Sequence, residues 1–149
     1  MCRTSFILVL AAFMLASPPP LTGTVDAQGV PAFDAAGTDA QHVTAFLKTL
    51  QSAVAVDNRL KVATLVEYPL MAWANGRVLT IRNDAEFQAR YSQVFDVSLR
   101  KSIADARLDA LSANQSGVMC DNGRLLFRPV VERKNALRIV AINEPGQAR

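Results

Sequence analysis

The stretch NQSGVMCDNGRLLFRPVVERKNALRIVAIN occupies residues 114–143 and decides the fold. Its pattern predicts three strands that pair antiparallel, at residues 115–120, 124–127 and 136–143. Asn122-Gly123 between the first two strands is a strong hairpin signal, because a type I′ turn needs positive φ at both central residues and Asn and Gly tolerate it. Pro129 cannot donate a hydrogen bond to a sheet, so we expect it to end the second strand or to cause a bulge, with residues 128–135 forming a loop.

The residues before this stretch carry the signals of helices that cover the sheet. Thr38 followed by Gln41 matches a capping box and opens a first helix, whose apolar residues recur at helical spacing from Val43 to Val54. The further elements expected in chain order are a helix over residues 58–66 capped by Asp57, a hairpin over residues 68–81 that turns at Asn75-Gly76, a helix opened by Asn83 and Glu86, and a helix over residues 98–111. The fold class is therefore α+β, with N-terminal helices packed on a mainly antiparallel sheet.

The beginning of the chain has the composition of a secretory signal peptide. Arg3 precedes an apolar run at residues 6–16, which is shorter than the roughly 20 residues that a transmembrane helix needs. Val25 and Ala27 supply the small residues of a cleavage site after Ala27. We expect an exported protein, periplasmic or secreted, with no stable membrane insertion after cleavage; an uncleaved membrane anchor is the alternative. The expected parts are a signal peptide (1–27), a flexible lead (28–37), a single domain (38–143) and a tail (144–149).

The charge pattern favours a solvated surface over a nucleic-acid site. The formal net charge is +3, and the basic residues are spread along the chain without a run longer than Arg100-Lys101. A nucleic-acid-binding protein usually concentrates its basic residues on one face. We therefore expect a mildly basic, solvated surface and no nucleic-acid partner.

Cys120 is the only cysteine left after cleavage, so no intramolecular disulfide can form. Burial as a small hydrophobic side chain is favoured over pairing with a second chain. A catalytic thiolate would need a base nearby, and the only histidine, His42, is distant in the sequence and is expected to be a partly exposed helix residue. One His and one Cys match no zinc-ligand spacing, so neither a metal site nor a cofactor is predicted.

Two N-terminal helices followed by four sequence segments resemble the nuclear-transport-factor-2-like superfamily, whose members share a cystatin-like α+β cone. The segments are VEYPL (66–70), NDAEFQARYSQVF (83–95), GVMCDNGRLLF (117–127) and LRIVAIN (137–143). The resemblance covers residues 38–143 and is to small exported bacterial members with no assigned activity. It implies a curved, cone-like sheet with a cavity at its wide end. Because this fold hosts isomerases, dehydratases, cyclases and non-enzymatic binding domains, it does not select a function.

The catalytic residues of the enzymes in this superfamily are not matched. In its ketosteroid isomerases an aspartate base precedes a proline at the entry to the first strand, and here Tyr68 precedes Pro69. A phenol with an ordinary pKa near ~10 is a poor base at neutral pH. Chemistry like that of scytalone dehydratase needs a histidine in the pocket, which His42 alone could supply. We therefore predict no catalytic residue.

Aromatic side chains are the expected lining of the cavity that the resemblance implies. Tyr and Trp bury apolar area while keeping a hydrogen-bonding group, which suits a ligand site. The candidates for ligand binding are Tyr68, Trp73, Tyr91, Phe95 and the charged Arg128. The alternative is that these side chains belong to the core, and it is favoured for Tyr91 and Phe95, which lie on one helical stripe.

The predicted function is an exported binding or interaction module of the cell envelope with an apolar pocket. Its partner would be a small apolar ligand or an envelope protein, and a homodimer is one arrangement left open. The first alternative is an isomerase or lyase acting on a small molecule, with Tyr68, Tyr91 or His42 as the acid–base group. The second is an inhibitor or immunity-type protein of a secreted enzyme, which would use the turns at Asn75-Gly76 and at residues 121–123.

Overall fold

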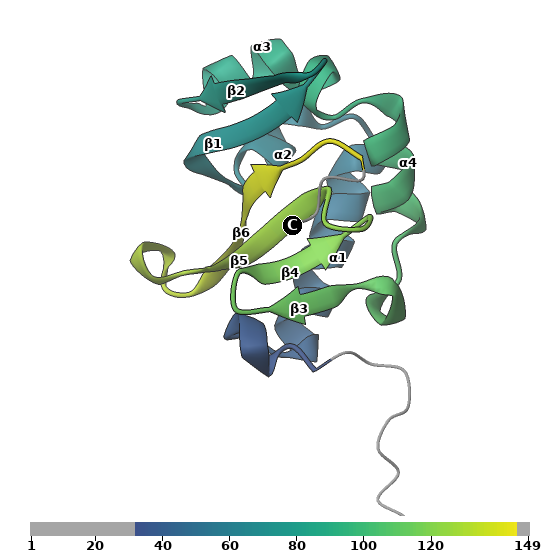
Figure 1. Cartoon of the computed structure of the whole chain (residues 1–149), viewed down its shortest axis with the longest axis vertical. Coiled ribbons are helices and arrows are strands. Elements are labelled where there is room, and N and C mark those ends of the chain that lie inside the picture. The colour runs from purple at the N-terminus through teal and green to yellow at the C-terminus, as the bar shows by residue number, and fades with distance from the viewer. Residues whose placement is uncertain (1–31, 146–149) are drawn as a thin grey trace, which may run out of the picture.

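Within residues 32–145, which the computed structural model describes, six strands form one open sheet in the order β2-β1-β6-β5-β4-β3 (Figure 1). Neighbouring strands are antiparallel except β1 and β6, which are parallel. The strands are β1 (Val66–Ala74), β2 (Arg77–Ile81), β3 (Ser112–Asn114), β4 (Gly117–Cys120), β5 (Leu125–Val130) and β6 (Ala136–Ile142). The predicted α+β class, with helices on a mainly antiparallel sheet, is confirmed. β3 and the parallel pair are additions to the prediction.

Four helices pack with this sheet in the described part of the chain, and α1 lies behind β4 and β5 in the view of Figure 1. The α-helices are α1 (Ala40–Ala55), α2 (Arg59–Ala63), α3 (Asp84–Val94) and α4 (Val97–Asp105), and the 3-10 helices are η1 (Asp34–Ala36), η2 (Leu108–Ala110) and η3 (Val131–Arg133). The core fills the space between helices and sheet. At its centre Phe46 of α1 stacks on Phe127 of β5, with ring centroids 4.7 Å apart.

The helix caps differ from the predicted ones in two of three cases. Asp39, not Thr38, caps α1 and accepts a hydrogen bond from the His42 N–H at 2.9 Å. Asn58, not Asp57, caps α2. In each case the next side chain, which caps a helix at least as well, takes the position, so the helix begins one residue later than expected. Asn83 caps α3 as predicted.

The last predicted helix ends at Asp105 rather than at residue 111, and a side chain from another helix binds its final carbonyl groups. Gln51 of α1 donates from its amide to the carbonyls of Ile103, at 3.0 Å, and of Ala106, at 2.9 Å. These bonds add a side-chain donor to carbonyl groups at the end of α4, where the helical hydrogen-bond ladder stops. The chain is extended at Ala106, and residues 108–110 form η2 instead.

Both Asn-Gly sites form turns, the first as the predicted two-residue hairpin and the second as a longer connection over residues 121–124, in which Asp121 also has a positive φ. Asn75 and Gly76 have φ of 54° and 71°, and Asn122 and Gly123 have φ of 53° and 85°. The positive φ values are those that Asn and Gly tolerate, and the two turns join β1 to β2 and β4 to β5.

Pro129 does not end its strand, which corrects the prediction. β5 continues to Val130, with Pro129 opposite Leu137 of β6, so the loop spans residues 131–135 rather than 128–135. The pairing of β5 with β4 stops at Phe127. Beyond this point β5 has a strand partner on one side alone, where a proline is tolerated. The irregularity in register lies earlier, between Leu126 and Phe127.

The segment before the domain is more ordered than its composition suggests. The predicted lead at residues 28–37 was expected to be flexible, but Asp34–Ala36 form η1 and Phe33 is 2 % exposed in the core. η1 contacts β3 and β4, so the Phe33 side chain closes the core at that edge of the sheet. Burial of a large aromatic side chain outweighs the flexibility that the surrounding Pro and Gly confer. The predicted signal peptide, residues 1–27, lies outside the described residues, and no described helix is long and apolar enough to span a membrane.

Candidate functional site

The five predicted ligand-binding residues do not come together in one cavity. Tyr91 and Phe95 are fully buried, and their rings stack with centroids 5.3 Å apart. Phe87 packs edge-on against both rings. These contacts place Tyr91 and Phe95 in the core, so the prediction that they line a pocket is corrected in favour of its alternative. The α3 stripe that carries them faces inward because it supplies the apolar side of that helix.

Trp73 lies on the face of β1 that points away from the helices. Burial alternates along this strand: Leu70 and Ala72 are buried, whereas Met71 is 57 % exposed and Trp73 is half-buried. Trp73 is paired with Val78 of β2, another partly exposed side chain. Trp73 therefore belongs to an open sheet surface and lines none of the clefts found among the described residues.

Arg128 and Tyr68 do line clefts, but two different ones. The Arg128 cleft, about 490 Å³, lies beside the β5–β6 connection and is lined by Ala36, Gly37, Gln115, Arg128, Pro129, Val130, Val131, Glu132 and Asn135. The Tyr68 cleft, about 360 Å³, is lined by Ala63, Thr64, Val66, Tyr68, Arg82, Asn83, Asp84, Arg133 and Arg138. The second cleft combines one aromatic ring with convergent polar side chains, so it is more polar than a typical small-molecule pocket but offers several groups that can orient a ligand.

Tyr68 is held at both ends of its side chain. The hydroxyl donates a hydrogen bond to the Ala63 carbonyl at 3.2 Å, and the ring packs edge-on against Phe87 with centroids 6.4 Å apart. Burial, with a smaller contribution from the charge of Asp84, raises the pKa of Tyr68 to about 12. The hydroxyl is therefore protonated at neutral pH and serves as a hydrogen-bonding group, not as a base.

Three arginines from three elements surround this cleft, and the sequence analysis did not select them. Arg82 precedes α3 and pairs with Glu86 at 3.4 Å, and Arg133 of η3 pairs with Glu67 at 3.3 Å. Arg138 of β6 is half-buried and forms no ion pair with any described residue. One signal was available in the sequence: Arg138 is a lone charge between Leu137 and Ile139, in a strand that is otherwise apolar.

His42 and Cys120 lie outside both clefts. The His42 side chain is 71 % exposed in the first turn of α1, and its Nδ1 lies 2.7 Å from an oxygen of Asp39. Cys120 is buried, as predicted. Burial, followed by the charge of Asp121, raises the pKa of Cys120 to about 11, which keeps the thiol protonated at neutral pH. No group of three His, Cys, Asp or Glu residues between 32 and 145 is arranged to hold a metal ion.

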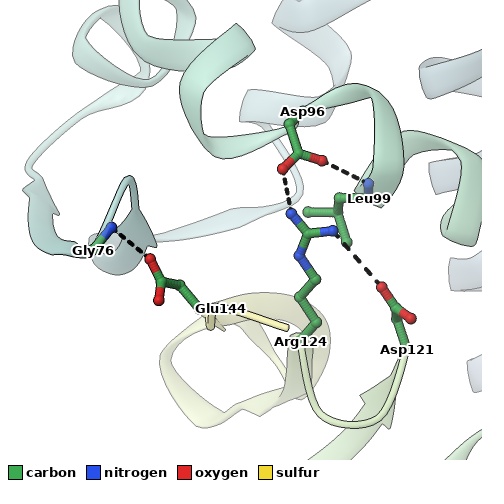
Figure 2. A network of polar contacts seen from close by, with 6 residues as sticks. All are labelled: Gly76, Asp96, Leu99, Asp121, Arg124 and Glu144. Atoms are coloured by element: carbon green, nitrogen blue, oxygen red, sulfur yellow. Dashed lines mark hydrogen bonds and ion pairs between the residues drawn. The ribbon is translucent and has the colours of Figure 1, made fainter. Parts of the chain in front are cut away.

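A buried arginine network joins the turn between β4 and β5 to the start of α4 (Figure 2). Arg124 is 5 % exposed; its guanidinium pairs with Asp96 and lies 3.9 Å from a carboxylate oxygen of Asp121. The other oxygen of Asp96 accepts a hydrogen bond from the Leu99 N–H at 2.8 Å. Burial alone would raise the pKa of Asp96, but these hydrogen bonds and the Arg124 charge lower it below its ordinary value. Since Arg124 is enclosed and paired, its part in this network is structural.

Comparison of the chain with protein-family models, with curated proteins and with solved structures returned no match. The resemblance to the nuclear-transport-factor-2-like superfamily therefore stays a prediction, and the chemistry of the clefts is the basis for a function.

Proposed function

We propose that the protein is an exported binding module that holds a small molecule in the Tyr68 cleft. The observation that carries this proposal is the position of Tyr68. Of the aromatic candidates, it is the one that lines a cleft of the described residues, and its ring and hydroxyl are both held in place. A pre-positioned aromatic ring with nearby polar groups binds a ligand at a low cost in conformational entropy.

The state of the Tyr68 hydroxyl supports binding over proton abstraction. With a pKa of about 12 the phenol keeps its proton at neutral pH. Its oxygen can still accept a hydrogen bond from a ligand while it donates to Ala63. The polar side chains around it also change the expected ligand: three arginines, Asn83 and Asp84 favour a molecule with polar groups over a purely apolar one.

No observation on the described residues favours the two alternatives. An isomerase or lyase would need an accessible acid–base group, but Tyr91 is fully buried and His42 lines neither cleft. An inhibitor would offer its turns to a partner, and Asn75, Gly76 and Asn122 are exposed, but exposure of a turn does not by itself indicate a partner.

Native mass spectrometry of the exported protein tests the proposal. The chain would be expressed from Met1 and purified from the periplasm under non-denaturing conditions. We expect an N-terminus at Gln28 and a co-purifying small molecule, or a small molecule captured from a fragment library. A cytoplasmic protein that retains residues 1–27 would contradict export.

Two threonine variants locate the ligand. Thr64 lines the Tyr68 cleft, and a phenylalanine at this position fills it. Thr49 is the control, because its hydroxyl also bonds a backbone carbonyl of its own helix but lies outside this cleft. Thr64→Phe is expected to abolish binding while Thr49→Phe retains it. Equal binding by both variants, with both folded, would show that the ligand does not occupy the Tyr68 cleft.

A further inference from the structure

The excess of positive over negative charge in this chain is found in one hairpin, although basic residues are spread along the whole sequence. Residues 128–138 hold four basic residues and one acidic residue, a net charge of +3. The whole chain has 16 basic and 13 acidic residues, so the remainder has 12 of each and is balanced. The hairpin formed by the end of β5, η3 and the start of β6 therefore carries the entire net charge.

Two arginines of this hairpin lie directly opposite each other. Arg128 of β5 and Arg138 of β6 are register partners in an antiparallel pair, so their side chains project from the same face of the sheet. Neither guanidinium forms an ion pair or a hydrogen bond with another residue of the described chain, although Arg124 and Arg133 both have carboxylate partners. Like charges placed directly opposite destabilise a sheet, and here no carboxylate of the described residues forms an ion pair with either guanidinium.

An oxoanion between the two guanidiniums would remove this repulsion. A guanidinium presents a planar fork of N–H donors that fits carboxylate and phosphate groups, and hydrogen bonds to charged groups are about twice as strong as neutral ones. Arg138 also lines the Tyr68 cleft, whereas Arg128 lines the other one, so an anion held between the two would lie at the Arg138 edge of the Tyr68 cleft. Asp84 is the one carboxylate that lines this cleft, and its charge acts on Tyr68, so the anionic group belongs at the Arg138 end.

We infer that Arg128 and Arg138 bind the oxoanionic group of the ligand whose other part occupies the Tyr68 cleft. The ligand class is thus a small organic carboxylate or phosphate, not the apolar molecule that the aromatic residues suggested. This inference rests on the proposed function, but it makes a separate claim, since a neutral ligand could fill the Tyr68 cleft without using either arginine.

Titrations followed by ¹H–¹⁵N NMR separate the two claims. The probes are inorganic phosphate, benzoate and the neutral benzyl alcohol, added to the exported protein at constant ionic strength. We expect phosphate and benzoate to shift the guanidinium N–H signals of Arg128 and Arg138, and benzoate to shift Tyr68 and Thr64 as well. Benzyl alcohol should bind more weakly than benzoate. In a separate phosphate titration at a higher NaCl concentration, we expect weaker phosphate binding, because salt screens the attraction between phosphate and the arginines.

Matched substitutions provide the control. Arg138→Gln is expected to weaken phosphate and benzoate binding at least about tenfold, because it removes charge-assisted hydrogen bonds. Arg77→Gln makes the same change in net charge at an exposed arginine that lies outside the hairpin and lines a different cleft. It should change the affinity by less than about twofold, the effect of net charge alone.

Each outcome decides one claim. Equal loss in both variants, or no shift of either hairpin arginine with phosphate and with benzoate, would overturn the anion inference. Equal binding of benzyl alcohol and benzoate at Tyr68 would also overturn it, while leaving the proposed ligand cleft intact. Phosphate binding at the arginines, with no probe shifting Tyr68 or Thr64, would instead remove the proposed function and leave an isolated anion site.

Discussion

The guanidinium of Arg124, at the turn between β4 and β5, pairs with Asp96, the residue that caps α4. One oxygen of the Asp96 carboxylate thus pairs with a buried cation, and the other accepts a hydrogen bond from the N-terminus of a helix. The two segments it joins are 28 positions apart in the sequence. This contact fixes where α4 begins relative to the sheet. Its loss should destabilise both the β4–β5 turn and the start of α4.

Replacing Asp96 tests this double role. Asp96→Ala removes a helix cap and leaves the Arg124 cation unpaired in a buried position. We expect the free energy of unfolding to fall by about 2–3 kcal/mol, below the ~3–5 kcal/mol of a fully buried pair because the Asp96 side chain is nearly half exposed. Urea unfolding measures the loss. The control is Asp39→Ala, which removes the cap of α1 but leaves no buried cation, so its effect should be smaller. Equal losses would contradict the role of the Arg124 pair.

The same carboxylate predicts a dependence of stability on acid pH. The pKa of Asp96 is lowered in the folded state, so the folded protein binds this proton less readily than the unfolded chain does. The stabilisation is therefore present above the ordinary aspartate pKa near ~3.9 and is lost as the pH falls through the lower folded-state value. Asp96→Asn keeps a capping side chain and removes the charge. Unfolding free energies between about pH 2 and pH 6 should show a shallower acid slope in this variant than in the native protein.

Cys120 predicts the opposite slope at alkaline pH. Burial raises the pKa of Cys120 from 9.0 to about 11, so the folded state holds this proton more tightly than the unfolded chain. Its contribution to stability is full below pH 9 and is lost as the pH rises towards 11. Cys120→Val should flatten this part of the profile. In the native protein we expect little reaction with a thiol reagent at pH 8 until urea unfolds the chain; fast labelling of the folded protein would show that the thiol is accessible.

Gly117 is expected to be irreplaceable at the start of β4. Its φ is 141°, and a Cβ would lie 2.6 Å from the Phe127 carbonyl oxygen and 3.0 Å from the Arg128 Cβ. Gly117→Ala should cost about 2–3 kcal/mol, because the strained backbone and the clash with a neighbouring strand add together. Gly76 also has a positive φ, but a Cβ there meets nothing within 4 Å. Gly76→Ala should therefore cost less, and thermal unfolding of the two variants compares them directly.

Phe33 predicts that the protein depends on a segment with the composition of a linker. Phe33→Ala removes a large side chain from the core edge at β3 and should lower the unfolding free energy by about 3 kcal/mol. A neighbouring exposed position supplies the control, and Asp34→Ala should change stability little. If both substitutions were neutral, Phe33 would not belong to the core.

The sequence predicted the features that depend on a few adjacent residues. The turns at Asn75-Gly76 and Asn122-Gly123 formed because the backbone preference of Asn and Gly is local. The α+β class followed for the same reason, from hairpins between consecutive strands. The predicted caps Thr38 and Asp57 were wrong: Asp39 is a stronger cap than Thr38, and Asn58 is as good a cap as Asp57.

The features that sequence reasoning missed depend on residues distant in the chain. Arg128 and Arg138 are ten positions apart, and only the register of β5 with β6 makes them partners. Arg124 is next to a turn, and its burial depends on Asp96 and α4, which are distant in the sequence. Tyr91 and Phe95 lie on the apolar stripe of a helix that packs into the core. Only their aromatic character suggested that they line a pocket. The superfamily resemblance pointed to Tyr68 as a site residue, whereas no sequence motif pointed to the arginines around it.

The position of β6 has a consequence for how the chain folds. β6 lies between β1 and β5, so the hairpin of β1 and β2 has no strand contact with β3, β4 and β5 until β6 is in place. β6 is also the last strand of the described residues, which means that both halves of the sheet expose an unpaired edge during synthesis. Native assembly must wait for contacts of high sequence separation, which slows folding. In a nascent chain that stops before residue 136, the edges of β1 and β5 that β6 would cover stay open, and chaperone binding or aggregation is its expected fate.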